Sequence, residues 1–152
     1  MKYNTFKVLV LSSLFVVMAG LIVYAEVEPR VIANIPFAFI VGNKTLPAGD
    51  YTIDRPDSND PNVLLIRNAN NRIAIFTNAE SVQAKQMPDK SELVFNRIGD
   101  KYFLSMVWVT GDDIGCEIPK PRAERELELS ASNSSAQTVT VQPGGQVKPT
   151  SE

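Results

Sequence analysis

The chain has 152 residues, 44% of them hydrophobic and 21% charged, and this length and composition fit one globular domain. Fifteen basic and seventeen acidic residues leave a net charge of -2, so the basic surface of a nucleic-acid-binding protein is not expected. One cysteine and no histidine exclude an internal disulfide, the Ser-His-Asp and Cys-His catalytic systems and most zinc sites. We therefore expect no metal and no cofactor.

Residues 1–25 have the pattern of a secretory signal peptide. Residues 1–7 carry two lysines and no acid, and residues 8–23 form an uncharged apolar run that leads to Ala25. An uncleaved membrane anchor is the alternative, but a helix over 8–23 would span about 24 Å, less than the roughly 30 Å hydrocarbon core. We expect cleavage near Ala25 and a secreted or periplasmic product, which contacts the membrane only through the uncleaved signal peptide.

The folded domain is expected over residues 26–129 and opens with alternating apolar residues. Pro36 interrupts this run and implies an edge position or a bulge, because proline has no N–H to donate. A turn at 42–44 follows, and then Tyr51 and Ile53 alternate with polar residues. The alternating residues, which would share one face of a strand, are Val31, Ala33, Ile35, Phe37, Phe39 and Val41.

Further strands follow a loop at 55–62. Asparagine-rich residues 68–71 and the Gly-Asp-Lys of 99–101 are typical hairpin turns. The strands expected beside these turns are 63–67 with 72–78, and 92–98 with 102–109, and residues 80–85 form a weak edge strand. Residues 102–109 are apolar at both alternating sets, which predicts a central strand that is covered on both sides. One set is Tyr102, Leu104, Met106 and Trp108, and the other is Phe103, Val107 and Val109.

A short surface helix is expected over 121–129, because Pro121 suits a first turn and Arg122 can pair with Glu126. The alternative is a strand over 126–129, where charged and apolar residues alternate. Residues 130–152 are rich in Ser, Thr, Gln, Pro and Gly and are expected to be a disordered tail, in which 138–141 is the one stretch that could add a strand.

These elements together predict an all-β fold. Six or seven short strands separated by turn residues are typical of a small antiparallel β-sandwich or barrel, here with one short C-terminal helix. Residues 35–51 (IPFAFIVGNKTLPAGDY) resemble the opening signature of a group of small, uncharacterised secreted bacterial β-rich proteins. The resemblance continues to a Pro-Lys…Arg-Ala-Glu-Arg segment at 119–125. It implies secretion and a β fold, and it carries no activity or site residue with it.

Acidic residues are the first candidates for catalysis or calcium binding. They are Asp54, Asp57 and Asp60 in one segment, Asp112 and Asp113 in another, and Glu124, Glu126 and Glu128 near the helix. We interpret them as solvated turn and surface residues, because none has the spacing of an EF-hand loop and acids are common in loops.

Cys116 and the aromatic side chains are the remaining candidates. We interpret Cys116 as a small buried side chain, with an intermolecular disulfide as the alternative. The aromatic residues are expected to fill the core, with an apolar ligand cavity as the alternative. These are Phe37, Phe39, Tyr51, Phe95, Phe103 and Trp108. We assign no catalytic, cofactor-binding or metal residue.

The sequence therefore favours an exported, non-enzymatic protein that either binds an envelope or extracellular partner or is itself a component of the cell envelope. Two alternatives stay open. One is a small β-barrel that carries an apolar ligand, and the other is a carbohydrate-active enzyme that uses a pair of carboxylates.

Overall fold

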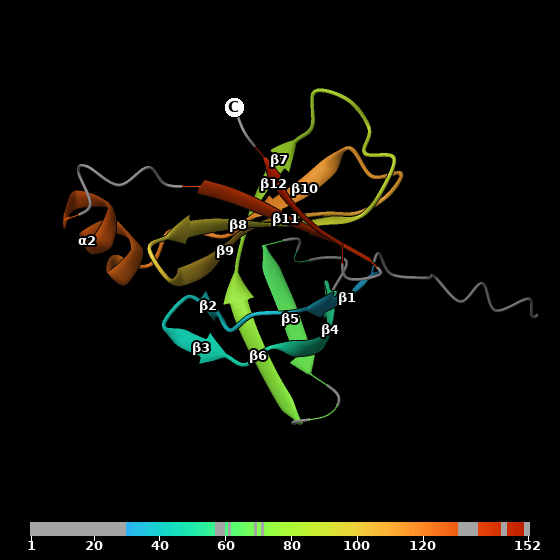
Figure 1. The fold of residues 1–152 in the computed structure, drawn as a ribbon. Helices are drawn as coiled ribbons and strands as arrows, with labels where there is room; N and C mark the ends of the chain where they lie inside the picture. The colour runs from blue at the N-terminus through green and yellow to red at the C-terminus, as the bar shows by residue number, and fades with distance from the viewer. Residues whose placement is uncertain are drawn as a thin grey trace, which may run out of the picture.

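The structure is a computed structural model, and its described residues form two β-sheets that face each other, with one helix at the side (Figure 1). The predicted signal peptide and Asp57 lie outside the described residues. Within the described part of the chain, no helix has the length and apolar character that spanning a bilayer requires. The residues described are 30–56, 60, 62–68, 70, 72–130, 137–143 and 146–150.

The first sheet has four antiparallel strands. In spatial order they are β1 (Arg30–Ile35), β4 (Gly49–Asp54), β5 (Val63–Asn68) and β6 (Ile73–Asn78). We call it the four-stranded sheet. Its two edge strands are β1 and β6.

The second sheet has eight strands. Its main path runs β12 (Gln146–Thr150), β11 (Gln137–Gln142), β8 (Glu92–Ile98), β9 (Lys101–Trp108), β10 (Ile114–Glu117) and β7 (Glu80–Gln83). The hairpin of β2 (Phe39–Val41) and β3 (Lys44–Leu46) joins this sheet where β2 pairs in parallel with β9. Helix α2 (Arg122–Ser130) follows β10.

The hydrophobic core lies between the two sheets and draws on both. Val31, Ile53 and Ile66 enter it from the four-stranded sheet, and Leu93 and Phe95 enter it from the eight-stranded sheet. Each of the two sheets ends in edge strands among the described residues, so the fold is a sandwich, the first of the two predicted all-β alternatives. The described residues form twelve strands where six or seven were expected, because proline, turns and the tail divide or extend the predicted segments.

Pro36 marks the point where the chain leaves one sheet for the other. Residues 31–41, expected as one interrupted strand, form β1 in the four-stranded sheet and β2 in the eight-stranded sheet. The alternation itself is confirmed, because all the predicted inward residues are buried except Phe37, which is half-buried beside the break. A proline suits such a break because it donates no ladder hydrogen bond.

The predicted turns are confirmed. Residues 42–43 connect β2 and β3, with Gly42 at a φ of 56°, and residues 99–100 connect β8 and β9, with Gly99 at a φ of 62°. The hairpin expected at 68–71 is confirmed by the pairing of Asn68 with Ile73, and Ala69 and Asn71 lie outside the described residues. The weak strand expected at 80–85 is β7, and it lies at a sheet edge as predicted.

The strand expected over 102–109 is central, between β8 and β10, and no residue from 102 to 109 is exposed. Its regular alternation is wrong at Ser105. Val94 pairs with Met106, but the next residue, Phe95, pairs with Leu104, so Ser105 is the extra residue of a β-bulge. Leu104 therefore belongs to the same core as Val107, whereas the sequence placed these two residues on opposite faces.

The tail expected to be disordered carries two strands. Residues 137–142 form β11, which pairs with β8, and residues 146–150 form β12, which pairs with β11. Val139 and Val141 are buried in the core between the sheets. Residues 138–141 were predicted as the one stretch of the tail that could add a strand, and this prediction is confirmed because the stretch lies within β11. Strand β12 was not expected. The edge of β8 supplies the apolar contacts that the tail's own composition lacks. Helix α2, close to the predicted 121–129, includes residues 126–129 and so excludes a strand there.

Candidate functional site

The acidic side chains that could form a catalytic or metal site each contact a different partner. Asp54 is buried and forms an ion pair with Arg67, and Asp60 Oδ1 accepts a hydrogen bond from the backbone N–H of Asn62 at 3.1 Å. Asp112 Oδ1 accepts a hydrogen bond from the Ile114 amide at 2.9 Å. Among the described residues, no three Asp, Glu or Cys side chains are grouped so that they could hold a metal ion.

Glu124 is the least exposed acidic residue in the described part of the chain. It is 2% exposed, and its Oε1 accepts a hydrogen bond from Asn96 Nδ2 at 2.8 Å. Burial raises the pKa of its carboxyl above the ordinary value of 4.5, an effect that Asn96 partly offsets. Asn96 is opposite Phe103, which is not part of the core between the sheets, so Glu124 contacts the face of the eight-stranded sheet that points away from that core. Glu124 thus fastens the helix to the sheet.

Two further acids of this region are on the surface of the helix. Glu126 pairs with Arg122 at 2.6 Å, the i,i+4 pair that the sequence predicts, and Glu128 pairs with Lys120 at 2.7 Å. The first pair lies within α2 and the second joins α2 to the residue before Pro121, and both are at the surface. Glu126 and Glu128 lie at the surface, as expected, but the interpretation as a solvated surface residue is wrong for Glu124, which is buried.

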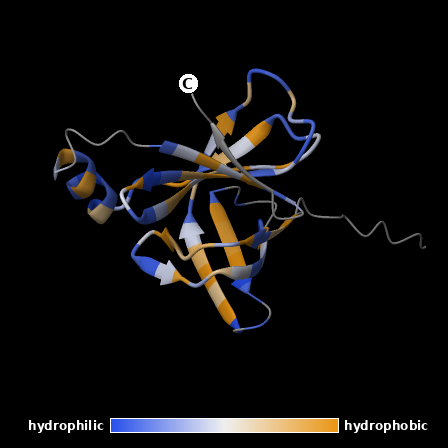
Figure 2. Ribbon diagram, viewed as in Figure 1, coloured by the Kyte–Doolittle hydropathy of each residue, from blue (hydrophilic) through white to orange (hydrophobic). Residues whose placement is uncertain are grey.

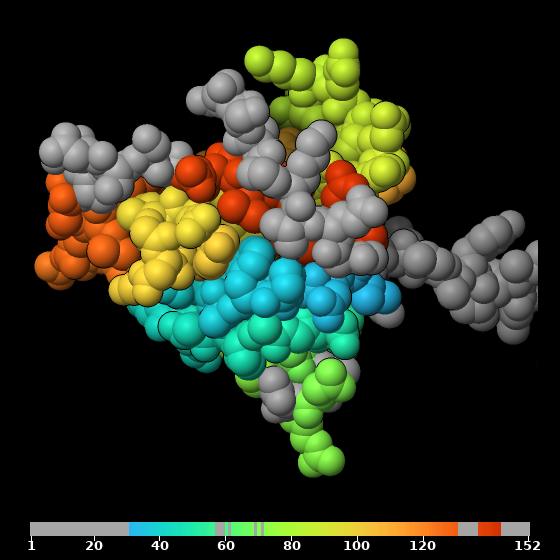
Figure 3. All heavy atoms as spheres, viewed as in Figure 1, coloured from blue at the N-terminus to red at the C-terminus, as the bar shows by residue number. Residues whose placement is uncertain are grey.

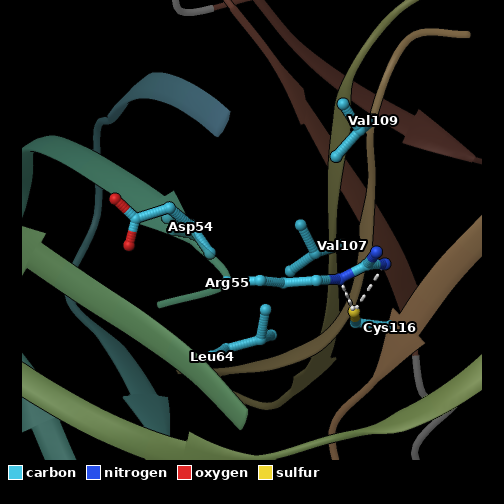
Figure 4. A pocket seen from close by; sticks show the side chains of 7 residues that line it. Asp54, Arg55, Leu64, Val107, Val109 and Cys116 are labelled. Atoms are coloured by element: carbon cyan, nitrogen blue, oxygen red, sulfur yellow. Dashed lines mark hydrogen bonds between the residues drawn. The ribbon is translucent and has the colours of Figure 1, made fainter. Parts of the chain in front are cut away.

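Cys116 and Arg55 connect the two sheets. Cys116 lies in β10, and Arg55 follows the last residue of β4. The Arg55 guanidinium extends from the four-stranded sheet to the eight-stranded sheet. It donates to Cys116 Sγ from Nε at 3.3 Å and from Nη2 at 3.2 Å (Figure 4). Nη2 also donates to the Ile114 carbonyl at 3.0 Å, and Nη1 lies 3.5 Å from Asp112 Oδ2. The cysteine is buried, as expected, at 2% exposed.

A small hollow adjoins this contact. Its volume is about 10 Å³, which is the room that a single water molecule needs. Its lining residues are Ile53, Asp54, Arg55, Leu64, Val107, Val109 and Cys116. Figure 4 shows Asp54 pointing away from Arg55 and Cys116. The contact between Arg55 and Cys116 joins the two sheets, and the hollow beside it is too small for an organic ligand.

The aromatic residues of the core contact one another. Phe37 stacks on Tyr102 with ring centroids 3.9 Å apart and meets Phe95 edge to face at 5.2 Å. Phe39 meets Tyr51 at 5.0 Å and Phe95 at 5.5 Å, again edge to face. These side chains therefore fill space between the sheets, as expected. Phe103 is also buried, but it is not part of this core. Trp108 lies elsewhere, against Gly115, where a Cβ atom would come within 2.4 Å of its ring.

The Leu-Pro-Ala-Gly-Asp-Tyr segment at 46–51 is a structural corner. The Tyr51 hydroxyl donates to the Pro47 carbonyl at 2.7 Å, and burial raises its pKa above the ordinary value of 10.0, which keeps it a donor. Gly49 has a φ of 153°, and a Cβ atom there would lie 2.9 Å from Asn68 Nδ2. The motif thus fixes the turn that leads into β4, and it supplies no reactive group.

The surface feature that the sequence did not single out is the outer face of β6. Phe76 is 68% exposed, and Ala74 is also exposed on the same face of the strand. Leu65 is the partner of Phe76 on β5, and Val63 is its diagonal neighbour; both are half-buried. We call these four residues the β6 patch. In Figure 2 the β5–β6 hairpin is coloured hydrophobic along most of its length, and in Figure 3 it projects from the body.

The sequence contained a signal for this patch. Residues 73–76 are four consecutive apolar residues, so one of the two faces of the strand had to present apolar side chains away from the core. The sequence predicts only a hairpin strand here, because it does not show whether a second layer covers the other face of that strand.

A second hollow, open to solvent and about 320 Å³ in volume, has a polar and charged lining. It is lined by Pro88, Asp89, Lys90, Glu92 and Gln142. Gln142 Nε2 donates to Glu92 Oε1 at 2.8 Å, so this pair joins β11 to β8 at the rim. The hollow is a surface recess beside a strand junction.

Comparisons with known proteins add no family to this description. The resemblance to small secreted bacterial β-rich proteins stays a prediction, and the fold and its surface are the grounds for a functional argument. In comparisons with protein-family models, with curated proteins and with solved structures, nothing matches this chain.

Proposed function

We propose that this chain is an exported, non-enzymatic binding protein of the cell envelope or the extracellular space, and that it binds through the β6 patch. The observation that carries the proposal is the exposed Phe76 on an edge strand, beside Leu65, Val63 and Ala74. Apolar side chains that gather on an exposed face mark interaction sites more often than do isolated ones. An aromatic side chain is also a common anchor of protein interfaces.

Export is supported by residues 1–25, which have a basic start, an uncharged apolar run over 8–23 and a small residue before the expected cleavage site. A binding role is supported by the way the candidate reactive groups are used. Asp54, Glu124 and Cys116 are all buried and engaged in contacts that hold sheets or helix together.

Export is tested by expressing the full chain in a bacterium, fractionating the cells and sequencing the N-terminus of the product. We expect the extracytoplasmic product to begin at Glu26. Replacing Val16 and Val17 together by arginine should keep the product inside the cell with Met1 retained, because two charges break the apolar run. The control is Ser13→Thr, which leaves the run uncharged. A wild-type chain that stays in the cytoplasm with an intact N-terminus would falsify the export half of the proposal.

The β6 patch is tested by retention in the envelope fraction. Phe76→Asp should shift the exported chain from the sedimenting envelope fraction to the soluble fraction, because a charge replaces the aromatic anchor. Met87→Asp is the matched control, since Met87 is 61% exposed but lies outside the patch. Equal retention of the two variants and the wild type contradicts binding through the patch. Unchanged circular dichroism and unfolding midpoints confirm that both variants fold.

A further inference from the structure

The edge of β6 differs from the other sheet edges of the described structure in having no protection against pairing. Edge strands are commonly guarded by charges, prolines or bulges, because their outer backbone groups can pair with another strand. At the other edges of the main strand paths, β1 begins with Arg30, β7 begins with Glu80, and β12 contains Lys148 and Pro149. Strand β6 (IAIFTN) has neither charge nor proline and keeps a regular ladder of six pairs with β5.

We propose that a second copy of this chain pairs with β6, antiparallel and about a two-fold axis, with Phe76 opposite Phe76 of the copy. The inference rests on the proposed function, because it takes the β6 patch as part of the contact surface. It names a second copy of this chain as the partner that binds there. Pairing in this way would join two four-stranded sheets into one continuous sheet of eight strands.

The pairing register follows from geometry. Residues opposite each other in an antiparallel pair point to the same face of the sheet, so an outward residue of one copy must face an outward residue of the other. Phe76 and Ala74 point outward, and Ile75 points into the core. Centring the axis on Phe76 puts the two rings side by side on the outer face and sets Ala74 opposite Asn78 of the copy.

The charges that flank β6 fit this register. Arg72 precedes Phe76 by four residues, Glu80 follows it by four, and both side chains are exposed. Counted along the chain, the two-fold axis therefore sets Arg72 of each copy level with Glu80 of the other, which is the first residue of β7. A shift of the axis to Ile75 would set Arg72 opposite Asn78 and Phe76 opposite Ala74, which loses the charge match and the ring pair. The uncharged strand with one positive and one negative flank is thus self-complementary.

Dimerisation is measured by sedimentation velocity of the full chain, purified from the cell fraction that holds it. One strand pair makes a small interface, so we expect a reversible dimer whose fraction rises with concentration. Phe76→Asp and Ala74→Lys should each raise the dimer dissociation constant by about 30-fold or more, the scale of a lost interface anchor. Met87→Asp should leave it unchanged. A monomer at every concentration up to about 1 mM, or equal dimerisation by Phe76→Asp and wild type, overturns the inference.

The register is tested by disulfide cross-linking. A mixture of the Ala74→Cys and Asn78→Cys chains should give a cross-linked heterodimer, because positions 74 and 78 are opposite each other in the proposed pair. Ala74→Cys alone is the matched control and should not cross-link with itself, since its two copies lie four positions apart on each strand. Native Cys116 is buried and should not contribute. Self-linking of Ala74→Cys without the mixed product contradicts the proposed register.

Failure of this inference and failure of the proposed function give different results. If the purified chain is monomeric but Phe76→Asp still leaves the envelope fraction, the surface binds another partner and self-pairing is wrong. If the purified chain dimerises with the predicted cross-links but keeps Met1 in the cytoplasm, self-pairing stands and the export proposal is wrong.

Discussion

Glu124 differs from the other charged residues of α2 because it is buried, and its burial makes its contribution to stability depend on its protonation. Its neighbours on the exposed side of α2, Glu126 with Arg122, form a surface pair that contributes little to stability. Glu124 instead accepts a hydrogen bond from Asn96, and its burial favours the neutral carboxylic acid. The residue therefore holds the helix most firmly when it is protonated.

The free energy of unfolding should reflect this proton. Because the folded pKa of Glu124 is raised above its ordinary value of 4.5, its contribution is fully present below about that pH and is lost as the pH rises through the raised pKa. Glu124→Gln keeps an acceptor for Asn96 but cannot ionise. We expect the stability of the wild type relative to Glu124→Gln to fall as the pH rises from 4.5 to 8, measured by urea unfolding. Glu126→Gln is the control, and parallel pH curves for wild type and Glu124→Gln contradict the prediction.

At the scale of the element, the sequence predicted what depends on neighbours along the chain. Gly42 and Gly99 take positive φ angles in the expected turns, and the alternation of 31–41 matches the buried face. It did not predict that Pro36 moves the chain between sheets or that Ser105 is a bulge. Both depend on which strand lies alongside, and that partner comes from a distant part of the sequence.

Strand β11 is the clearest case of this dependence. Its valines are set among Ser, Thr and Gln, so the segment cannot form a core by itself, and the composition favoured disorder. Beside β8, however, Val139 pairs with Phe95 and Val141 with Leu93, and both valines are buried. The contact surface of the candidate site was missed for a similar reason, because the exposure of Phe76 depends on the absence of a covering layer over β6.

Truncating Val141 distinguishes a packed strand from a disordered tail. Val141→Ala should lower the free energy of unfolding by about 2 kcal/mol, because it removes two buried methyl groups and leaves a cavity in the core. Gln137→Ala changes an exposed residue of the same strand and should shift stability by less than about 0.5 kcal/mol. Both are measured by urea unfolding at one pH. If the two variants are equally stable, the tail does not belong to the core.

For the molecule as a whole, the polar contact between Arg55 and Cys116 complements the apolar core between the sheets. Apolar packing between the sheets is non-directional. The guanidinium, by contrast, fixes the end of β4 against β10 through two directional N–H···S contacts. The same guanidinium reaches Asp112 and the Ile114 carbonyl, so it ties the loop before β10 into the contact. Loss of this group should loosen one end of the sandwich and leave the far end unchanged.

A double-mutant cycle measures how strongly Arg55 and Cys116 are coupled. Arg55→Met should cost more than Cys116→Ala, because it also leaves the Ile114 carbonyl and Asp112 without the guanidinium. The double variant should be more stable than the sum of the two single losses predicts by about 1 kcal/mol, since the shared contact is lost only once. Arg122→Met with Cys116→Ala is the control cycle, and it should be additive because Arg122 lies on the exposed side of α2. Additive losses for Arg55 and Cys116 would mean that the sheets are joined by apolar packing alone.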